Sequence, residues 1–239
     1  MERVSAMTRK GYLDRLLTAY TRVAVLSDKN GCTVYRLRHN TKGQDLVLRS
    51  FSQPIAAYEI LRDVACDALP LIYDTVTLDD GQIVLEEFID GVTVAEIMET
   101  GKYRYRGAKA VLTAVCEALT VLHQRGLVHR DVKPENVMID KSGRVVLIDF
   151  NASRQVSDAA KDTLIMGTVG YASPEQLGIT QSDARTDIYA AGILLNTMLT
   201  GKHPSEQLAG GRAGRIVKKC TQLTPIDRYQ TAALLAAAL

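Results

Sequence analysis

The sequence predicts an α+β fold with two lobes, a small β-rich lobe followed by a larger and mainly helical one. Short runs with β-type alternation fill residues 22–88, whereas longer runs with helical spacing dominate residues 89–239. The turn-forming sequence Ile-Asp-Gly at 89–91 separates the two lobes. Residues 1–21 are predicted to form a helical extension before the first strand.

Composition places the chain among ordinary globular proteins. It has 239 residues, of which 46% are hydrophobic and 23% charged, and its net charge of +2 gives no global reason to bind nucleic acid or a membrane surface. The longest apolar stretch, around Ala190–Leu199, is too short to span a bilayer, and the start lacks the apolar core of a signal peptide. We therefore expect a cytoplasmic protein whose four dispersed cysteines are reduced and buried.

The β-rich lobe is expected to hold one sheet and one inserted helix. Helical spacing of apolar residues from Leu13 to Tyr20 predicts an amphipathic helix over about 5–20, which packs as core or lobe surface. A second helix is expected after Pro54 and should end before Pro70. Period-two runs predict the strands, which are 22–26, 33–38, 45–51, 71–78 and 82–88.

The second lobe is expected to contain helices around a polar centre. Residues 109–126 have helical spacing and end at Gly126, a typical C-cap. The polar stretch 129–136 follows, and then a hairpin over 137–150 and a long polar loop to about 175. Helices are predicted around 187–199 and, twice more, within 216–239.

The stretch HRDVKPEN at 129–136 crowds polar groups between two apolar runs. Phosphoryl transfer from ATP requires a carboxylate beside the attacking hydroxyl, oxygen ligands for a divalent cation, and positive charge on the phosphate. Asp131, Lys133 and Asn136 are of the required types. The hairpin is expected to return Asp149 to the same place, so the sequence predicts a phosphoryl-transfer site.

Together these motifs resemble the eukaryotic-type serine/threonine protein kinase domain, and in particular its small bacterial members. HRDVKPEN is similar to the catalytic loop H-R-D-x-K-P-x-N, and Asp149-Phe150-Asn151 stands at the D-F-G motif. Ser173-Pro174-Glu175 resembles A-P-E, and Arg228 resembles its arginine partner. The resemblance covers about residues 22–235 and implies the bilobal kinase fold, with one αC-type helix in a β-rich N-lobe and a mainly α-helical C-lobe.

The resemblance also implies catalytic roles. Asp131 would orient the substrate hydroxyl and accept its proton, while Lys133 would bring positive charge to the transferring phosphate. Asn136 and Asp149 would hold Mg²⁺ or Mn²⁺ with ATP. Thr168 resembles the threonine that bonds near the catalytic acid. The implied partners are protein substrates, and the chain itself where self-association permits autophosphorylation.

Other motif residues are expected to shape the activation segment and the core. Arg130 would pair with a phosphate or another anion on that segment. The candidate anions are Ser153, Ser157 and Thr163 once phosphorylated, or Asp162. Three structural roles are implied as well: His129 packs near Phe150, Asp187 braces the loop backbone, and Glu175 pairs with Arg228.

The β-rich lobe departs from the family pattern. The three positions of the glycine-rich turn that covers the ATP phosphates hold Ser27, Lys29 and Cys32. Arg49 occupies the position of the strand lysine, and Glu59 matches the helix-borne glutamate partner. Because arginine's planar fork does not copy a lysine ammonium, weak ATP binding is expected, and Arg49→Lys should tighten it.

Three interpretations therefore compete. The chain is an active kinase in which Arg49 and Glu59 replace the usual pair, an active kinase that recruits Lys29, or a pseudokinase that acts as a nucleotide-binding or scaffolding module. A small-molecule kinase would lack Lys133 and Glu175. A last alternative concerns a basic run that is either a solvated face or a substrate-docking site; it consists of Arg212, Arg215, Lys218 and Lys219.

Overall fold

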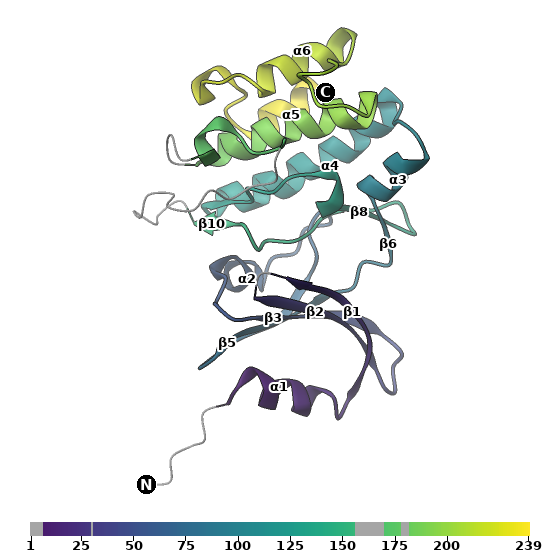
Figure 1. Ribbon diagram of the computed structural model, residues 1–239, viewed down its shortest axis with the longest axis vertical. Helices are drawn as coiled ribbons and strands as arrows, with labels where there is room; N and C mark the ends of the chain where they lie inside the picture. The colour runs from purple at the N-terminus through teal and green to yellow at the C-terminus, as the bar shows by residue number, and fades with distance from the viewer. Residues whose placement is uncertain (1–6, 30, 156–169, 178–181) are drawn as a thin grey trace. The chain divides into compact units, whose positions relative to one another are not determined.

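A computed structural model describes residues 7–29, 31–155, 170–177 and 182–239. The chain divides into two compact units (Figure 1). The β-rich unit consists of Met1–Ala65 and Pro70–Phe88, and the helical unit consists of Cys66–Leu69 and Ile89–Leu239. Each unit is built around its own hydrophobic core.

Within the described residues, the β-rich unit contains a five-stranded antiparallel sheet in the order β1-β2-β3-β5-β4. Its strands overlap the five predicted runs, and β1 extends beyond its predicted range at both ends, starting at Tyr20 within the predicted helical extension. They are β1 (Tyr20–Lys29), β2 (Cys32–His39), β3 (Asp45–Phe51), β4 (Ile72–Leu78) and β5 (Gly81–Glu87).

The connection between β1 and β2 is a tight hairpin turn. Lys29 and Cys32 are the last paired residues, and Gly31 has a φ of 73°, which a glycine adopts without strain. A Cβ on Gly31 would lie 2.4 Å from Ser52 Oγ, so the Ser52 side chain would have to rotate to admit another residue here. This glycine therefore serves the hairpin itself.

Helix α1 (Arg9–Leu16) covers one face of this sheet (Figure 1). Thr8 caps it by accepting a hydrogen bond from Gly11 N at 3.2 Å. Its apolar stripe packs on buried Leu37 and Leu48, as the sequence indicated. The helix is shorter than predicted, because the chain turns after Leu16 and then enters the sheet, where Tyr20 pairs with His39.

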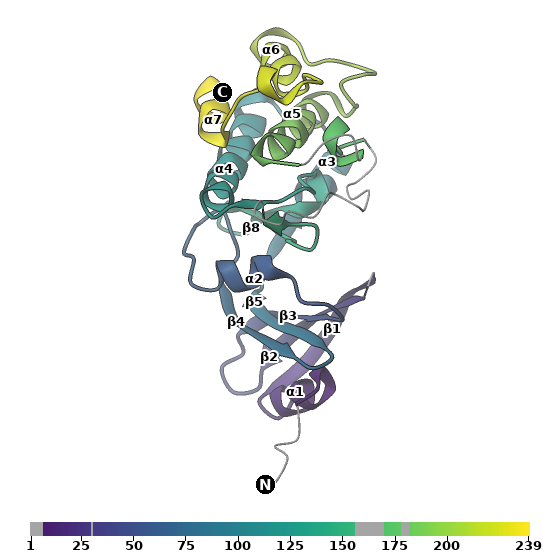
Figure 2. The ribbon, with the colours of Figure 1, turned by 90° about the vertical axis from the view of Figure 1, so that its left-hand side faces the viewer.

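Helix α2 (Ala56–Leu61) lies on the opposite face (Figures 1 and 2). The Tyr58 ring packs on Phe51 of β3 with the ring centroids 5.3 Å apart. Gln82 of β5 accepts a hydrogen bond from Ile55 N at 2.9 Å and so anchors the start of the helix. The helix ends at Leu61 and so before Pro70, as predicted, and it is shorter than the apolar-spaced segment that indicated it.

In the helical unit, α4 and α5 form the centre, with α7 packed on α4 and α6 on α5 (Figure 2). The helix α3 was not predicted, although Thr93 and Glu96 form a capping box that marks its start. The elements are β6 (Gly91–Thr93), α3 (Val94–Thr100), α4 (Tyr105–Gln124), β7 (Leu127–Val128), η1 (Pro134–Asn136), β8 (Val137–Asp140), β9 (Val145–Leu147), β10 (Arg154–Gln155), η2 (Pro174–Leu177), α5 (Ala184–Thr200), α6 (Gly211–Cys220), η3 (Pro225–Asp227) and α7 (Ala232–Ala238).

The helices pack closely at small residues. A Cβ on Gly192 of α5 would lie 2.3 Å from Cys220 Cβ of α6, so only glycine permits this approach. Cys116 of α4 is buried as well, and its burial raises the pKa of the thiol to about 12.

Among the described helices, none combines the length and the apolar character that a membrane span needs.

Candidate active site

The backbone of the predicted catalytic loop is held by a buried carboxylate on α5. Asp187 accepts hydrogen bonds from His129 N at 2.9 Å and from Arg130 N at 2.8 Å, and His123 Nε2 lies 2.8 Å from the same carboxylate. Arg130 has a φ of 69°, which is uncommon outside glycine. The hydrogen bonds to Asp187 hold the backbone in this uncommon conformation, so the loop is ordered before a substrate binds. The bracing role expected of Asp187 is therefore present.

His129 is a packing residue, as predicted. Its ring is buried and meets the edge of Phe150 at a centroid distance of 5.7 Å. Its Nε2 lies 3.2 Å from the Ile148 carbonyl oxygen. These contacts tie the loop to the segment that carries Asp149.

Asp131, Lys133 and Asn136 meet in one cluster. Lys133 Nζ lies 2.7 Å from Asp131 Oδ2, and Asn136 Nδ2 donates to the same oxygen and to the Asp131 carbonyl oxygen, each at 2.8 Å. The Asp131 and Lys133 side chains are 17% and 19% exposed, so neither is fully buried. The carboxylate is thus oriented by two donors, as a base must be oriented to accept a proton.

The β8–β9 hairpin returns Asp149 to this cluster. Val137 pairs with Leu147, and Ile148 N donates to the Asn136 carbonyl oxygen at 2.9 Å, so Asn136 and Asp149 stand at the same end of the hairpin. Asp149 has a φ of 69°, and its Oδ1 accepts a hydrogen bond from Asn151 N at 3.2 Å.

These two residues fit a hard divalent cation. Asn136 uses its Nδ2 within the cluster, and its Oδ1 accepts no hydrogen bond from the residues that the structure describes. A carboxylate and an amide oxygen are ligands that Mg²⁺ prefers, with water and phosphate oxygens completing its shell. No group of three or more His, Cys, Asp or Glu side chains in the described ranges is arranged to hold a metal ion alone.

The segment around Glu175 is fastened to the same loop. Arg228 donates to Glu175 Oε1 and Oε2 at 2.6 and 2.9 Å, and both side chains are buried. Gln176 Nε2 donates to the Arg130 carbonyl oxygen at 2.8 Å. Burial by itself raises the pKa of Glu175, but the hydrogen bond and charge of Arg228 outweigh it, so the pKa lies below its ordinary value. The predicted Glu175–Arg228 pair is confirmed.

Most of the predicted activation segment lies outside the described residues. This applies to Ser157, Asp162, Thr163 and Thr168. Ser153 is described, and its hydroxyl lies 3.4 Å from the His129 carbonyl oxygen. The anion expected to pair with Arg130 therefore stays a prediction.

In the β-rich unit, Arg49 does not form the predicted pair with Glu59. Arg49 Nε donates to Glu86 Oε1 at 2.6 Å, and both side chains are buried. The sheet register explains this pair: Arg49 stands opposite Val84, and Glu86 lies two residues farther along β5 on the same face. A diagonal neighbour at that position is within reach of a long side chain.

Glu59 is directed away from the sheet. Helix α2 buries Ala57, Tyr58 and Leu61, so the intervening position faces outward; the Glu59 side chain is 55% exposed and pairs with Arg62 at 3.6 Å. Lys29 is exposed at the end of β1.

Glu86 was missed by the sequence reasoning. The available signal was an acidic residue in the apolar run 82–88, at a position that alternation assigns to the face of Val84. A buried carboxylate on a central strand requires a cation, and Arg49 on the adjacent strand supplies it.

Comparisons with known proteins agree with this geometry. The pattern that describes the protein kinase domain matches residues 32–234. The serine/threonine-protein kinase PknB of Mycolicibacterium smegmatis is 37% identical over 146 residues, which are 57% of this chain and 23% of that protein. A probable serine/threonine-protein kinase of Clostridium perfringens is 29% identical over 222 residues, which are 82% of this chain and 32% of that protein.

The fold has a solved counterpart. The PknI kinase domain of Mycobacterium tuberculosis superimposes with a TM-score of 0.69 at 22% sequence identity, covering 92% of this chain and 94% of that one. The fold is therefore the bilobal kinase fold that the sequence predicted. The chain spans only about a quarter to a third of the length of the curated relatives described above.

Proposed function

The chain belongs to the protein kinase domain family, and from that premise we propose that it transfers the γ-phosphate of ATP to serine and threonine hydroxyls of proteins, its own chain included. The observation that carries the proposal is the Asp131 cluster. In this cluster the Asp131 carboxylate lies 2.7 Å from Lys133 Nζ and accepts a hydrogen bond from Asn136 Nδ2 at 2.8 Å, all on a preorganised loop.

Asp131 orients the attacking hydroxyl and accepts its proton, because its carboxylate is both held in place and partly exposed. Lys133 lies beside it and places positive charge where negative charge accumulates on the transferring phosphate. Asp187 acts through the backbone of His129 and Arg130 and is a positioning residue.

Asn136 and Asp149 would hold the magnesium or manganese ion that accompanies ATP. When bound, such an ion neutralises phosphate charge and aligns the phosphates for in-line transfer. The contribution of the chain is to present both oxygen ligands at one end of the β8–β9 hairpin.

A transfer assay tests the proposal. With labelled Mg-ATP and a generic protein substrate, Asp131→Asn should lower phosphate incorporation about a hundredfold or more, because the proton acceptor is lost. Asp90→Asn is the matched control, since Asp90 is an exposed acid of the same unit. Equal incorporation by wild type and Asp131→Asn would contradict the proposal.

Two observations favour a second candidate function, that of a pseudokinase. Arg49, at the position of the strand lysine, is neutralised by Glu86, and the turn at Lys29 is a tight hairpin. Both features favour weak binding of ATP. The same assay separates the alternatives, because a pseudokinase transfers no phosphate even when a thermal-shift titration with Mg²⁺ or Mn²⁺ detects bound nucleotide.

A further inference from the structure

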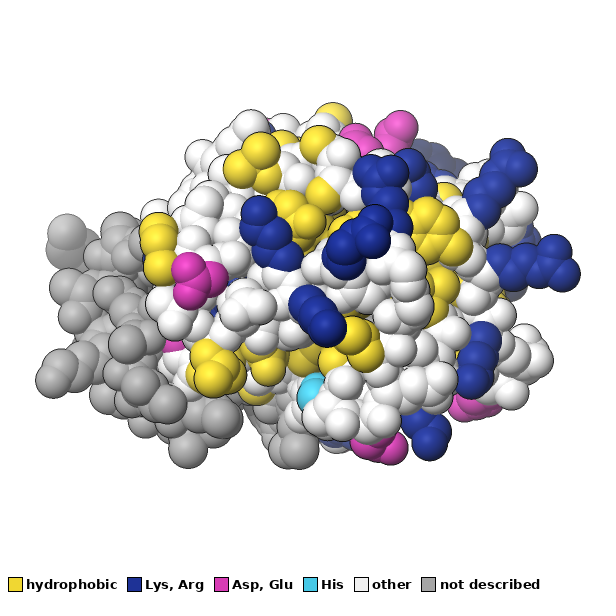
Figure 3. Space-filling view, turned by 90° about the horizontal axis from the view of Figure 1, so that it is seen from above, with side chains coloured by type: hydrophobic (Ala, Val, Ile, Leu, Met, Phe, Trp, Pro, Cys, Tyr) yellow, Lys and Arg dark blue, Asp and Glu magenta, His cyan; other side chains and the backbone are white. Residues whose placement is uncertain are grey.

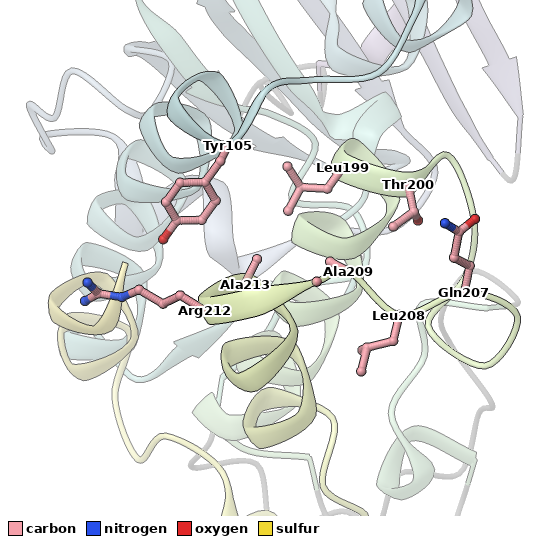
Figure 4. Close-up of a pocket in the computed structure, with 9 residues that line it drawn as sticks. Tyr105, Leu199, Thr200, Gln207, Leu208, Ala209, Arg212 and Ala213 are labelled. Atoms are coloured by element: carbon pink, nitrogen blue, oxygen red, sulfur yellow. The ribbon is translucent and has the colours of Figure 1, made fainter.

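A pocket of about 400 Å³ lies in the helical unit (Figure 4). It is formed by the start of α4, the end of α5, the loop that follows α5, and the first turn of α6. Tyr105 and Leu199 face Ala209 and Ala213 across it. Leu208, a partly exposed apolar side chain, also lines the pocket. The lining therefore suits an apolar group.

The walls of the pocket are fixed by buried hydrogen bonds. Asn196 Nδ2 donates to the carbonyl oxygens of Lys202 and Gln207 at 2.9 and 2.8 Å, and its Oδ1 accepts from Ala209 N at 2.8 Å. One buried amide thereby fixes the loop at three points. A pocket whose walls are ordered before binding loses little conformational entropy when it is filled.

The surface around the pocket is basic. Residues 101–109, which lead into α4, contain four Lys or Arg and no acid, and residues 201–220 contain five Lys or Arg and one acid, Glu206. The whole chain has a net charge of only +2, so positive charge is concentrated in these segments. Figure 3 views the end of the helical unit where α6 lies, and there Lys and Arg side chains surround exposed hydrophobic ones.

Arg212 stands at the rim of the pocket. Its Nε donates to the Ala238 carbonyl oxygen at 3.1 Å, which holds the guanidinium in place. Its two terminal nitrogens have no hydrogen-bond partner among the residues that the structure describes, and the side chain is exposed. A guanidinium held in this way is suited to a carboxylate, which it can bind through two parallel hydrogen bonds.

From these observations we infer that the pocket is a docking site for an acidic segment of a partner protein. The segment inserts one bulky apolar side chain between Tyr105 and Ala213, while its carboxylates lie against Arg212 and the neighbouring cations. A concave pocket of about 400 Å³ can enclose an inserted side chain, which favours a peptide over a flat lipid surface. This inference does not depend on phosphoryl transfer, because binding is measured without ATP.

Fluorescence anisotropy tests the inference with a short labelled peptide in which glutamate and serine surround a single central phenylalanine. We expect saturable binding that weakens as salt is raised. Replacing the phenylalanine of the peptide with alanine should weaken binding about tenfold, because the apolar anchor is lost. Replacing the glutamates with lysines should abolish it.

Variants of the protein locate the site. Arg212→Glu should weaken peptide binding about fivefold or more, because a favourable rim charge becomes repulsive. Gln207→Glu adds a negative charge at the same rim and should act in the same direction. Lys42→Glu makes the same charge change at an exposed residue of the β-rich unit and should alter binding less than twofold. Circular dichroism checks that each variant is folded.

Three results would overturn the inference. Equal effects of Arg212→Glu and Lys42→Glu would show that only net charge matters. Equal binding of the phenylalanine and alanine peptides would show that the pocket is not used. Binding to vesicles that contain phosphatidylglycerol, without binding to the peptide, would assign the basic surface to a membrane.

Discussion

Two buried arginines, one in each unit, form ion pairs of different geometry. In the helical unit, Arg228 forms two parallel hydrogen bonds with Glu175 and also donates to the carbonyl oxygens of Arg185, Gln222 and Leu223. In the β-rich unit, Arg49 donates through Nε to Glu86, across two strands of one sheet. Both pairs join residues far apart in the sequence, but the first holds the chain at η2 to the chain after η3, whereas the second links adjacent strands of one sheet.

This difference indicates a structural role for Arg228, whereas the pairing of Arg49 bears on the binding of ATP. Arg228 satisfies its donors within the fold, and its pair with Glu175 stabilises the helical unit. Arg49 occupies the position that the sequence analysis assigned to the family's strand lysine, and its charge is neutralised by Glu86. The helical unit thus retains the family's ion pair, whereas the β-rich unit has formed a different one. The predictions below test this contrast.

The largest effect is expected for the pair in the helical unit. Arg228→Met should lower the free energy of unfolding by about 3 to 5 kcal/mol, because it leaves a buried carboxylate without its cation. A urea titration measures the change. Arg185→Met, at a partly exposed arginine paired with Asp183, is the matched control and should cost about 1 kcal/mol or less. Equal losses in the two variants would refute the structural role assigned to Arg228.

This pair also sets an expected pH dependence. The pKa of Glu175 is lowered in the folded protein, so its contribution to stability is complete above the unfolded pKa of about 4.3 and disappears as pH falls through the lower folded pKa. Glu175→Gln should therefore flatten the acid limb of a plot of stability against pH. An unchanged acid limb would contradict the assignment.

A somewhat smaller effect is expected in the β-rich unit. Glu86→Leu should lower the free energy of unfolding by about 3 kcal/mol, because it removes the carboxylate paired with a buried guanidinium. Adding Arg49→Met should restore most of that loss, since an apolar pair can replace a buried ion pair. Glu59→Leu, at an exposed position, should change stability by less than about 0.5 kcal/mol. A larger loss from Glu59→Leu than from Glu86→Leu would restore the pairing predicted from the sequence.

The smallest effect concerns the affinity for ATP. Glu86→Gln keeps an oxygen acceptor for Arg49 but removes the negative charge, so ATP should bind about fivefold more tightly in a calorimetric titration. The sequence alone predicted tighter binding for Arg49→Lys, but with Glu86 beside this position the variant should change the affinity less than about twofold, because the lysine also faces that carboxylate. Tighter binding in Arg49→Lys, with none in Glu86→Gln, would show that side-chain shape rather than neutralisation limits ATP binding.

The Asp131 cluster was predictable because its members lie within six consecutive residues. A loop of that length, followed by a hairpin, brings Asp131, Asn136 and Asp149 together through local chain geometry alone. The five strands were predictable for a similar reason, since strand-forming residue types and the turn residues between the runs are features of short stretches of sequence. Helix α2 was predictable as well, because Pro54 and Pro70 bracket it in the sequence, and it ends at Leu61.

By itself, the sequence determined the kinase-type order of strands and helices and the composition of the catalytic loop. The partnership of Glu175 with Arg228, which lie 53 residues apart, was predicted from the resemblance to the kinase family and not from local chain geometry. Only the tertiary structure decided which acid pairs with Arg49, since β3 and β5 are separated by an inserted helix and a further strand, and their register selects Glu86. It also decided where the basic segments and the pocket near Arg212 meet. Local motifs depend on short-range chain geometry, whereas partners across a sheet or between helices depend on packing.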